Sequence, residues 1–550
     1  MAKNSFLILH PKDDLAVALV DLKQDQVIEH GEQSLTLLDN VKLKHKFALC
    51  DFPKDAIMTQ YGVPVGRALM DIKTGQAITV ENTEHSSDDM CNWMPGYQAP
   101  PTDASHFEGQ SFKGYHRKDG QVGTRNNWLV IPLVFCENNN LMTLREVFNR
   151  ELGFTDHSSY QTELRQLTEL YKNGASVDDI LNSAETSTST AKSSNNLFPN
   201  VDGLKFLFHN MGCGGTNEDS QVLAKLLAGY IKHPNTAGAT ILSLGCQKTQ
   251  MGLLESYMEQ LDVTDKPIYF HEQQKIGSEK GLISQAIKST FAGLIQANKH
   301  ERADAPLSKL VIGVECGASD GFSGISANPT IGQVSDLIVK LGGAAVLSEF
   351  PELFGVEKEM IMRCKDENTA NTFIDLMRKY EARAEADGTS MSTNPSPGNI
   401  KDGLITDAMK SAGAAKKGGT AVIQDVQDYP GYIRKAGLNL LNTPGNDVES
   451  CTALAGAGCN LILFSTGLGT PTGNPVTPVI KVSSNSTVAV KMPDIIDFDT
   501  GCIISGEKSL EETGQNLLQH CIDVASGTTL SKSEKLGQDD FIPWKRGTSL

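Results

Sequence analysis

Short runs of aliphatic and β-branched residues recur along the chain, and after Phe112 they alternate with longer amphipathic stretches. The runs have the length of buried strands and cover residues 128–134, 204–208, 240–244, 310–314, 344–347, 420–423, 461–465 and 487–490. The stretches between them include residues 220–231 and 367–383, which have helical spacing. This alternation predicts an α/β fold, with α/β layers and mainly parallel sheets.

The first part of the chain has a different pattern. Residues 16–20, 34–38 and 76–80 are short β-favouring runs separated by Asp, Gly and Lys, with no long helical period. We therefore expect a small β-rich domain over residues 1–85. The polar segment 86–108 contains Pro95, Pro100 and Pro101, which is typical of a linker.

The remaining chain is expected to form two α/β domains, residues 109–390 and 391–550. The Gly-, Ser- and Pro-rich segment 385–399 would be a hinge between them. The Ser-, Thr- and Asn-rich segment 175–196 is predicted to be a surface excursion.

Charge and cysteine content narrow the class of protein. The 550 residues have a formal net charge of −17, which argues against nucleic acid as a partner but not against a small anionic substrate. The longest strongly apolar stretch, residues 128–136, is interrupted by Pro132 and is too short to span a membrane. We expect no leader before the first strand, and the number of cysteines, eleven, is odd, so reduced thiols in a cytoplasmic protein are expected.

Glycine-rich loops follow several of the expected strands, at residues 208–215, 244–248, 314–324 and 464–473. Ligands bind outside the carboxyl ends of strands in open α/β sheets, and glycine lets the backbone approach an anion there. None of these loops is a P-loop, and the glycine spacing in residues 467–473 misses the dinucleotide fingerprint. No nucleotide cofactor is therefore expected.

Three of these loops place a cysteine at a strand end: Cys213, Cys246 and Cys316. Small apolar cysteines pack well in such positions, which is one interpretation. The other is a shared thiolate site for Fe²⁺ or an iron–sulfur centre.

Two further groups of residues have the chemistry of a binding site. His10, Asp14 and His45 are suitable ligands for a divalent ion, although surface histidines and an ion pair explain them equally well. Arg125 precedes an expected strand and is a candidate for holding a carboxylate through its planar guanidinium group. The polar turns at 328–329, 394–399 and 443–447 are either loop corners or hydrogen-bonding sites for a polyhydroxylated ligand.

At these loops the chain resembles a known family. The residues that support the resemblance are Gly-Leu-Asn-Leu-Leu at 437–441, Thr-Pro-Gly-Asn-Asp at 443–447, and segments 453–459, 464–467 and 496–499. In this order they resemble the altronate/galactarate dehydratase family. Residues 13–14, 45–49 and 61–66 resemble its small N-terminal SAF domain. The chain departs from the family at Ala318, Leu468 and Thr472, where the family has Gly, Arg and Tyr.

The resemblance implies a metal-dependent hydro-lyase that converts a sugar acid, D-altronate first, to 2-dehydro-3-deoxy-D-gluconate and water. Galactarate or another sugar acid is the alternative substrate, and a non-catalytic sugar-acid-binding protein is the alternative of another class. The expected metal is Fe²⁺, with Mn²⁺ or Mg²⁺ as alternatives, and a homo-oligomer is possible.

For a reaction of this kind, we assign roles to the candidate residues as a hypothesis. The metal would be held by His10, Asp14 and His45, or alternatively by Cys213, Cys246 and Cys316. Proton transfer would fall to Lys46, Tyr61 and His45. The residues expected to bind substrate are Arg125, Asn126, Ser319, Asp320, Asn328, Asn446 and Asp447.

Overall fold

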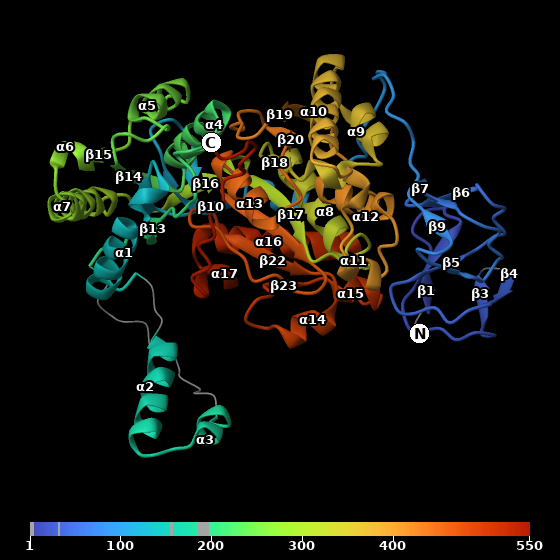
Figure 1. The fold of residues 1–550 in the computed structure, drawn as a ribbon. Coiled ribbons are helices and arrows are strands. Elements are labelled where there is room, and N and C mark those ends of the chain that lie inside the picture. The colour runs from blue at the N-terminus through green and yellow to red at the C-terminus, as the bar shows by residue number, and fades with distance from the viewer. Residues whose placement is uncertain (1–4, 31–32, 155–157, 185–196) are drawn as a thin grey trace.

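The computed structural model describes residues 5–30, 33–154, 158–184 and 197–550. In Figure 1 a strand-rich N-terminal unit lies at one side of a large central sheet, and a smaller α/β unit lies at the other side. The predicted fold class is confirmed, because a strand-rich N-terminal unit is followed by helices and parallel sheets.

The N-terminal unit is built from short strands with apolar side chains facing inward. Its four-stranded antiparallel sheet has the order β1-β2-β5-β8, and a hairpin and a three-stranded sheet complete it. The strands are β1 (Phe6–Leu7), β2 (Leu15–Ala18), β3 (Val27–His30), β4 (Gln33–Thr36), β5 (Lys46–Ala48), β6 (Ile57–Gln60), β7 (Val63–Ala68), β8 (Ala77–Ile78) and β9 (Thr83–Glu84).

The segment expected to be a linker follows the body of the protein in an extended path. The indole nitrogen of Trp93 donates a hydrogen bond to the carbonyl of Cys364, and the Tyr97 hydroxyl donates to the carbonyl of Thr420. These contacts attach the segment to the C-terminal unit.

The second unit contains a four-stranded parallel sheet of order β13-β12-β14-β15 beside a three-stranded antiparallel sheet of order β11-β10-β16. Its strands are β10 (Ser111–His116), β11 (Val122–Gly123), β12 (Asn127–Pro132), β13 (Gly203–Phe206), β14 (Thr236–Ser243), β15 (Ile268–Glu272) and β16 (Ala303–Pro306). Its helices are α1 (Asn138–Leu152), α2 (Ser158–Lys172), α3 (Val177–Leu181), α4 (Asn217–Lys232), α5 (Met251–Gln260), α6 (Gln273–Ile276) and α7 (Glu279–Ala297). Helices α2 and α3 project from the body as a hairpin, while residues 185–196 of the predicted excursion lie outside the described residues (Figure 1).

The C-terminal unit is organised around a parallel seven-stranded sheet of order β19-β20-β18-β17-β21-β22-β23. Its strands are β17 (Val311–Gly317), β18 (Ala344–Leu347), β19 (Ile423–Gln427), β20 (Gly437–Leu441), β21 (Leu461–Thr466), β22 (Val479–Ser483) and β23 (Phe498–Asp499). Its helices are α8 (Ala327–Lys340), α9 (Glu357–Arg363), α10 (Glu367–Ala386), α11 (Pro397–Lys401), α12 (Asp407–Ala414), α13 (Asp447–Gly456), α14 (Ser486–Lys491), α15 (Gly501–Ile504), α16 (Leu510–Ser526) and α17 (Lys532–Lys535).

This sheet takes strands from both sides of residue 390, where the sequence suggested a boundary. Strand β17 pairs with β18 on one side and with β21 on the other. The chain continues from β17 to β18, and after β20 it returns across β17 to form β21. The strand order therefore reverses between β17 and β21, and such a switch point creates a crevice beyond the carboxyl ends of the strands.

One expected strand is wrong, and a second, 420–423, overlaps its strand β19 only at Ile423. Residues 487–490 lie in helix α14, because Asn485 caps that helix by accepting a hydrogen bond from the backbone N–H of Val488. Val490 is exposed, which shows that its apolar side chain does not mark a buried strand. The helical stretches 220–231 and 367–383 are confirmed as parts of α4 and α10.

Candidate active site

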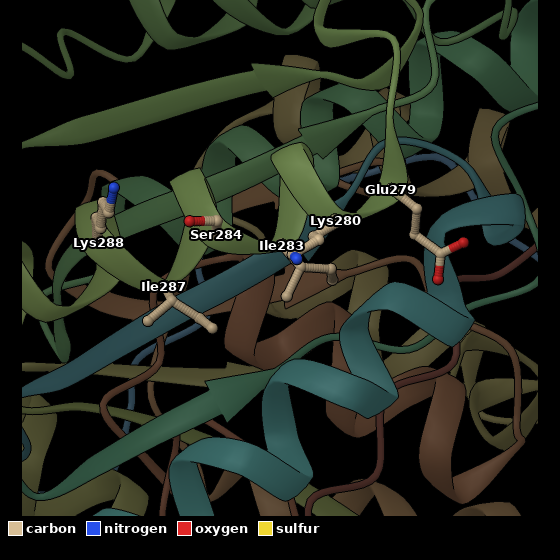
Figure 2. Close-up of a pocket in the computed structure, with 6 residues that line it drawn as sticks. All are labelled: Glu279, Lys280, Ile283, Ser284, Ile287 and Lys288. Atoms are coloured by element: carbon tan, nitrogen blue, oxygen red, sulfur yellow. The ribbon is translucent and has the colours of Figure 1, made fainter.

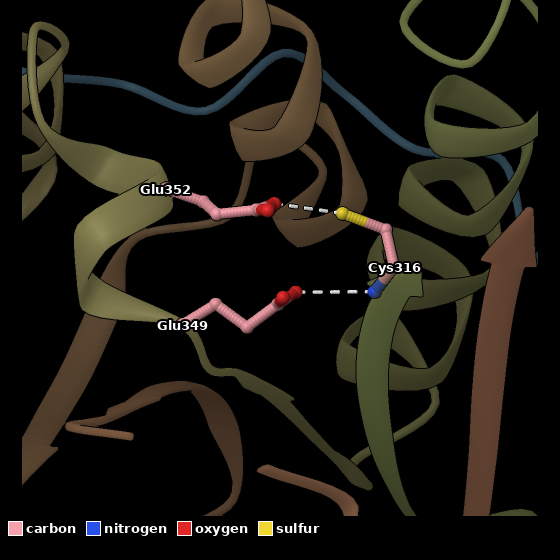
Figure 3. Close-up of side chains that lie close together, drawn as sticks. All are labelled: Cys316, Glu349 and Glu352. Carbon is pink, nitrogen blue, oxygen red and sulfur yellow. Dashed lines mark hydrogen bonds between the residues drawn. The ribbon is translucent and has the colours of Figure 1, made fainter. Parts of the chain in front are cut away.

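A thiol and two carboxyl groups meet at the carboxyl end of the seven-stranded sheet (Figure 3). Cys316 lies near the end of β17, and Glu349 and Glu352 lie in the segment that follows β18. The Cys316 thiol donates a 2.8 Å hydrogen bond to Glu352 Oε2, and its backbone N–H donates a 3.1 Å bond to Glu349 Oε2. One ligand atom from each residue lies within 4.8 Å of the others, so this group can hold a metal ion.

Two lysine ammonium groups enter the same site. Lys417 Nζ lies 2.7 Å from Cys316 Sγ and 2.6 Å from Glu349 Oε2. Lys410, from α12, pairs with Glu352 Oε1 at 2.8 Å. We call Cys316, Glu349, Glu352, Lys410 and Lys417 the Cys–Glu–Lys centre.

Burial and close charges shift the ionisation of this centre. Burial and the carboxylate of Glu352 raise the pKa of Glu349. Burial acts in the same direction on Glu352, but the ammonium groups of Lys410 and Lys417 outweigh it and lower its pKa. Burial lowers the pKa of Lys417, yet its anionic neighbours have the larger combined effect and raise it. We therefore expect both lysines to remain charged.

Glu315 lies behind the centre and is fully buried. Its Oε2 accepts hydrogen bonds of 2.8 Å from the Ser348 hydroxyl and 2.5 Å from the Ser450 hydroxyl. Burial and the charge of Glu349 raise the pKa of Glu315 well above its ordinary value. Burial therefore favours the protonated form of this side chain.

Asp447, at the start of α13, lies beside the centre. A Cβ atom on Gly317 would come within 2.0 Å of Asp447 Oδ2, so β17 needs glycine at this close approach. Burial, with the charges of Glu349 and Glu352, raises the pKa of Asp447 to about 7. Such a group can exchange a proton near neutral pH.

Several buried polar atoms around the centre have no hydrogen-bond partner among the described residues. They are both carboxylate oxygens of Asp407, the Ser411 hydroxyl, Glu349 Oε1 and the Asn394 amide nitrogen. Asp407, Lys410 and Ser411 are spaced three and four residues apart on α12, so they share one face of that helix. A buried polar atom without a hydrogen bond costs free energy of folding. A polar ligand that bonded to these atoms would remove that cost, so the region is suited to binding one.

The N-terminal unit contacts the C-terminal unit beside this region. Lys44 Nζ forms a 2.8 Å ion pair with the buried Asp320, in the loop that follows β17. His45 Nε2 lies 3.0 Å from the carbonyl oxygen of Lys401, and Lys46 Nζ donates to the carbonyl of Gly403. The Tyr61 hydroxyl fills the space next to Gly324 and Gly413.

Burial also changes the ionisation of the residues at this joint. Lys46 is 2 % exposed, and the loss of hydration lowers its pKa to about 8. Burial raises the pKa of Tyr61, and the nearby charges of Asp13 and Asp320 act in the same direction. Burial, with the charge of Lys46, lowers the pKa of His45 against the effect of its hydrogen bond to Lys401.

His10 and Asp14 lie in turns of the N-terminal unit. His10 Nδ1 accepts a hydrogen bond from the backbone of Lys12, and Asp14 Oδ1 accepts a 2.7 Å bond from the backbone of Thr59. Burial raises the pKa of Asp14 to about 6. Within the described residues, the structure does not bring the ligand atoms of His10, Asp14 and His45 within 4.8 Å of one another.

Arg125 joins the second unit to the C-terminal unit, and Asn126 forms hydrogen bonds within the second unit. Arg125 is 2 % exposed and forms a two-pronged pair with Glu534, at 2.6 and 3.0 Å. The amide nitrogen of Asn126 donates to the carbonyls of Asn200 and Ala297. The guanidinium group of Arg125 is thus directed at a carboxylate, as the sequence suggested, but that carboxylate belongs to the chain itself.

The polar residues after β17 are held by hydrogen bonds within the chain. The carbonyl of Ser319 accepts a bond from the Asn399 amide. Besides Lys44, Asp320 accepts bonds from Ser323 and Ser484. Asn328 donates to the carbonyl of Gly413, and Asn446 caps α13. Of the residues expected to bind substrate, Asp447 lies beside the Cys–Glu–Lys centre.

The three candidate cysteines lie in two different sheets. Cys316 is part of β17, whereas Cys213 and Cys246 follow β13 and β14 of the second unit. Cys316 is buried, and the other two are exposed.

Sequence reasoning missed four members of the centre: Glu349, Glu352, Lys410 and Lys417. A signal was present for the glutamates, because Glu-Phe-Pro-Glu at 349–352 begins two residues after the expected strand 344–347. Polar residues directly beyond a buried parallel strand deserve consideration as site residues. The lysines had no such signal, since folding brings α12 and the following turn to the site from more than 60 residues away.

An open cavity lies away from this centre. It has a volume of about 580 Å³ along α7 and is lined by Glu279, Lys280, Ile283, Ser284, Ile287 and Lys288 (Figure 2). It includes none of the residues of the Cys–Glu–Lys centre. Among the described helices, none is long and apolar enough to cross a membrane.

The fold and the site together define the class of protein: an α/β protein with a strand-rich N-terminal unit and a buried, charged centre at the carboxyl end of a parallel sheet. Comparisons with known protein families give matches to three consecutive parts of the chain. Residues 4–86 match the altronate/galactarate dehydratase SAF domain, residues 114–298 match the D-galactarate dehydratase/altronate hydrolase second domain, and residues 307–549 match the D-galactarate/altronate dehydratase C-terminal domain.

Full-length relatives show the same relationship. The chain is 32 % identical to an altronate dehydratase of Bacillus subtilis over 548 residues, covering 99 % of this chain and 100 % of the relative. It is 33 % identical to an altronate dehydratase of Escherichia coli, covering 95 % of each chain. A galactarate dehydratase (L-threo-forming) of Escherichia coli is 28 % identical, covering 97 % of this chain and 95 % of the relative. The chain belongs to the altronate/galactarate dehydratase family, as the sequence motifs predicted.

Proposed function

We propose that this chain is a hydro-lyase that dehydrates D-altronate to 2-dehydro-3-deoxy-D-gluconate at the Cys–Glu–Lys centre. Family membership supports dehydration of a sugar acid, and identities of 32 % and 33 % to two altronate dehydratases favour altronate. The observation on which the proposal rests most is the pair of buried ammonium groups, Lys410 and Lys417, among the acidic groups of this centre.

The chemistry explains why such a centre is needed. The reaction removes the proton on C2, next to a carboxylate, and expels the hydroxyl group on C3. Removing that proton creates an enediolate with two negative charges. Fixed cations in a water-poor site stabilise this charge as it develops, and Lys410 and Lys417 supply two of them.

Proton transfer is assigned to groups that titrate near neutral pH. We propose that Asp447, with a pKa of about 7, protonates the departing hydroxyl group. Lys46, with a pKa of about 8, is our candidate for the base, and Tyr61 and His45 would close the joint on the substrate. These roles place the N-terminal unit at the entrance of the site.

The hydroxyl groups of the substrate need partners as well. We propose that Asp407, Ser411 and Asn394 bind them, because these residues have buried polar atoms without partners in the described structure. Ser319, Asp320 and Asn328 would instead position the loop between β17 and α8. Arg125 and Asn126 would stabilise the fold and would not contact the substrate.

The residues of the centre fit a divalent ion. One thiolate and two carboxylates suit a borderline ion such as Fe²⁺, and Glu349 Oε1 has no partner among the described residues. When bound there, the ion would neutralise charge on the substrate carboxylate. Lys417 contacts two of the same ligand atoms, Cys316 Sγ and Glu349 Oε2.

The test is an assay for 2-keto-3-deoxy acid with altronate, galactarate and mannonate, each with added Fe²⁺, Mn²⁺ or Mg²⁺. We expect altronate to give the highest kcat/KM. A higher kcat/KM with galactarate than with altronate would show that galactarate is the preferred substrate. Binding of a sugar acid without any product would show a non-catalytic protein.

A further inference from the structure

Three exposed cysteines lie at one edge of the four-stranded sheet of the second unit. Cys136 follows β12, Cys213 follows β13 and Cys246 follows β14. Strand β12 lies between the other two, and all three run parallel, so the cysteines follow the same ends of three neighbouring strands. Neighbouring strands are about 4.8 Å apart.

Exposure makes this group unusual. Of the eleven cysteines, Cys50, Cys136, Cys213 and Cys246 are exposed, and three of these four are at this edge. Cysteine is among the residue types most often buried, and packing does not explain a thiol that faces solvent.

The loops that hold these cysteines are bonded to one another. The backbone N–H of Phe135 donates a 3.0 Å bond to the carbonyl of Met211, and that of Lys248 donates a 2.9 Å bond to the carbonyl of Gly212. Gly212 has a φ of 103°, and a Cβ atom there would come within 2.2 Å of the carbonyl oxygen of Leu133. The close approach of the loops therefore depends on glycine.

Buried polar atoms next to the cysteines also lack partners among the described residues. They are Glu137 Oε1 and the hydroxyl of Thr249, both on side chains of residues with 0 % exposure. A cavity of about 260 Å³ lies over the loop of Cys213, lined also by Phe135 and Lys545. Cys213 lines this cavity, and Cys136 and Cys246 do not, so the edge combines thiols and unsatisfied polar atoms with space beside one of the cysteines.

The sulfurs are too far apart for one ion to bind all three in this arrangement. In the described chain the ligand atoms of Cys136, Cys213 and Cys246 do not all lie within 4.8 Å of one another. One ion with metal–sulfur bonds of about 2.3 Å holds its sulfurs closer than this. A cluster binds each thiolate to a different iron, which requires wider spacing.

We infer that Cys136, Cys213 and Cys246 hold an iron–sulfur cluster, in a site separate from the Cys–Glu–Lys centre. Three thiolates leave one iron of a four-iron cluster without a cysteine ligand. Cys316, which the sequence grouped with Cys213 and Cys246, takes no part in this site. The inference does not depend on the proposed dehydration of altronate.

The test measures iron and acid-labile sulfide in the full chain after anaerobic incubation with ferric iron, dithiothreitol and sulfide. We expect about four of each per chain, with the broad visible absorption of sulfide-bound iron. The variants Cys136→Ser, Cys213→Ser and Cys246→Ser should each lose the sulfide and the absorption. Cys50→Ser, at the other exposed cysteine, should keep both, and Cys316→Ser should keep the sulfide.

A second measurement does not depend on variants. In the loaded protein, Cys136, Cys213 and Cys246 should be protected from alkylation, while Cys50 reacts, and a chelator should remove the protection. Iron without sulfide, an unchanged sulfide content in the triple serine variant, or equal alkylation of all four cysteines would overturn the inference.

Discussion

Lys417 places its ammonium nitrogen 2.7 Å from the sulfur of Cys316, and both side chains are almost completely buried. A cation in this position compensates the acidic groups that converge beyond β17 and β18. The same cation is a suitable partner for an anionic reaction intermediate. Stability and activity should therefore both respond when it is removed.

Lys417→Met tests this relationship. Leaving the partners of a buried ion pair uncompensated costs about 3–5 kcal/mol, so we expect the urea midpoint to fall and turnover to be lost. Lys416→Met, at the neighbouring position outside the centre, is the matched control. Unchanged unfolding and unchanged turnover in Lys417→Met would contradict the role of the ammonium group.

Asp447 gives a prediction for the pH dependence. Its pKa is raised to about 7 by burial, with Glu349 and Glu352 adding to the effect, so the carboxyl group loses its proton as the pH rises through that value. If it protonates the departing hydroxyl group, kcat should fall above pH 7. Asp447→Asn should lower kcat and remove that limb of the profile.

The control for this profile is another buried carboxyl group. Burial raises the pKa of Glu357 to about 7 as well, but this residue bonds to the backbone of Gly355 and is not part of the centre. Glu357→Gln should leave the limb in place. A profile that changes with Glu357→Gln and not with Asp447→Asn would contradict the assignment.

The ion pair between Lys44 and Asp320 should hold the N-terminal unit against the site. Lys44→Met is expected to raise KM for the sugar acid and to speed proteolysis within residues 86–108. In a double-mutant cycle with Asp320→Asn, we expect a coupling energy of about 0.5–3 kcal/mol. Lys42→Met, at an exposed lysine nearby, is the control, and additive effects at 44 and 320 would contradict the contact.

Arg125 distinguishes a structural role from a substrate-binding one. Because it pairs with Glu534 in a buried position, Arg125→Ala and Glu534→Gln should each destabilise the fold by about 3–5 kcal/mol. KM should be unchanged at temperatures where both variants are folded. A raised KM with an unchanged melting temperature would instead support direct contact with the substrate.

The sequence was most informative about the order of elements. Runs such as 344–347 and 461–465 are strands because continuous apolar character is required in a parallel sheet covered on both faces. The run at 487–490 misled because a short apolar stretch fits either a strand or a helix, and the cap at Asn485 decided in favour of the helix.

The candidate site was harder to predict, since its members come from distant segments. Cys316 was singled out as a strand-end residue, but its partners Glu349 and Lys417 become visible only when β17, β18 and the turn after α12 are folded together. The sequence predicted that Arg125 would bind a carboxylate, but it did not predict that the carboxylate would be that of Glu534. A guanidinium group that can bind a substrate carboxylate binds Glu534 equally well, and the sequence does not distinguish the two.

In the proposed function, the Cys–Glu–Lys centre eliminates water from a sugar acid. The most direct measurement is single-turnover formation of 2-keto-3-deoxy acid from altronate by the metal-replete protein, compared with Glu349→Gln and with the control Lys416→Met, at a position outside the centre. We expect 2-keto-3-deoxy acid from the unaltered chain and from the control, and none from Glu349→Gln. Full product formation by Glu349→Gln would contradict it.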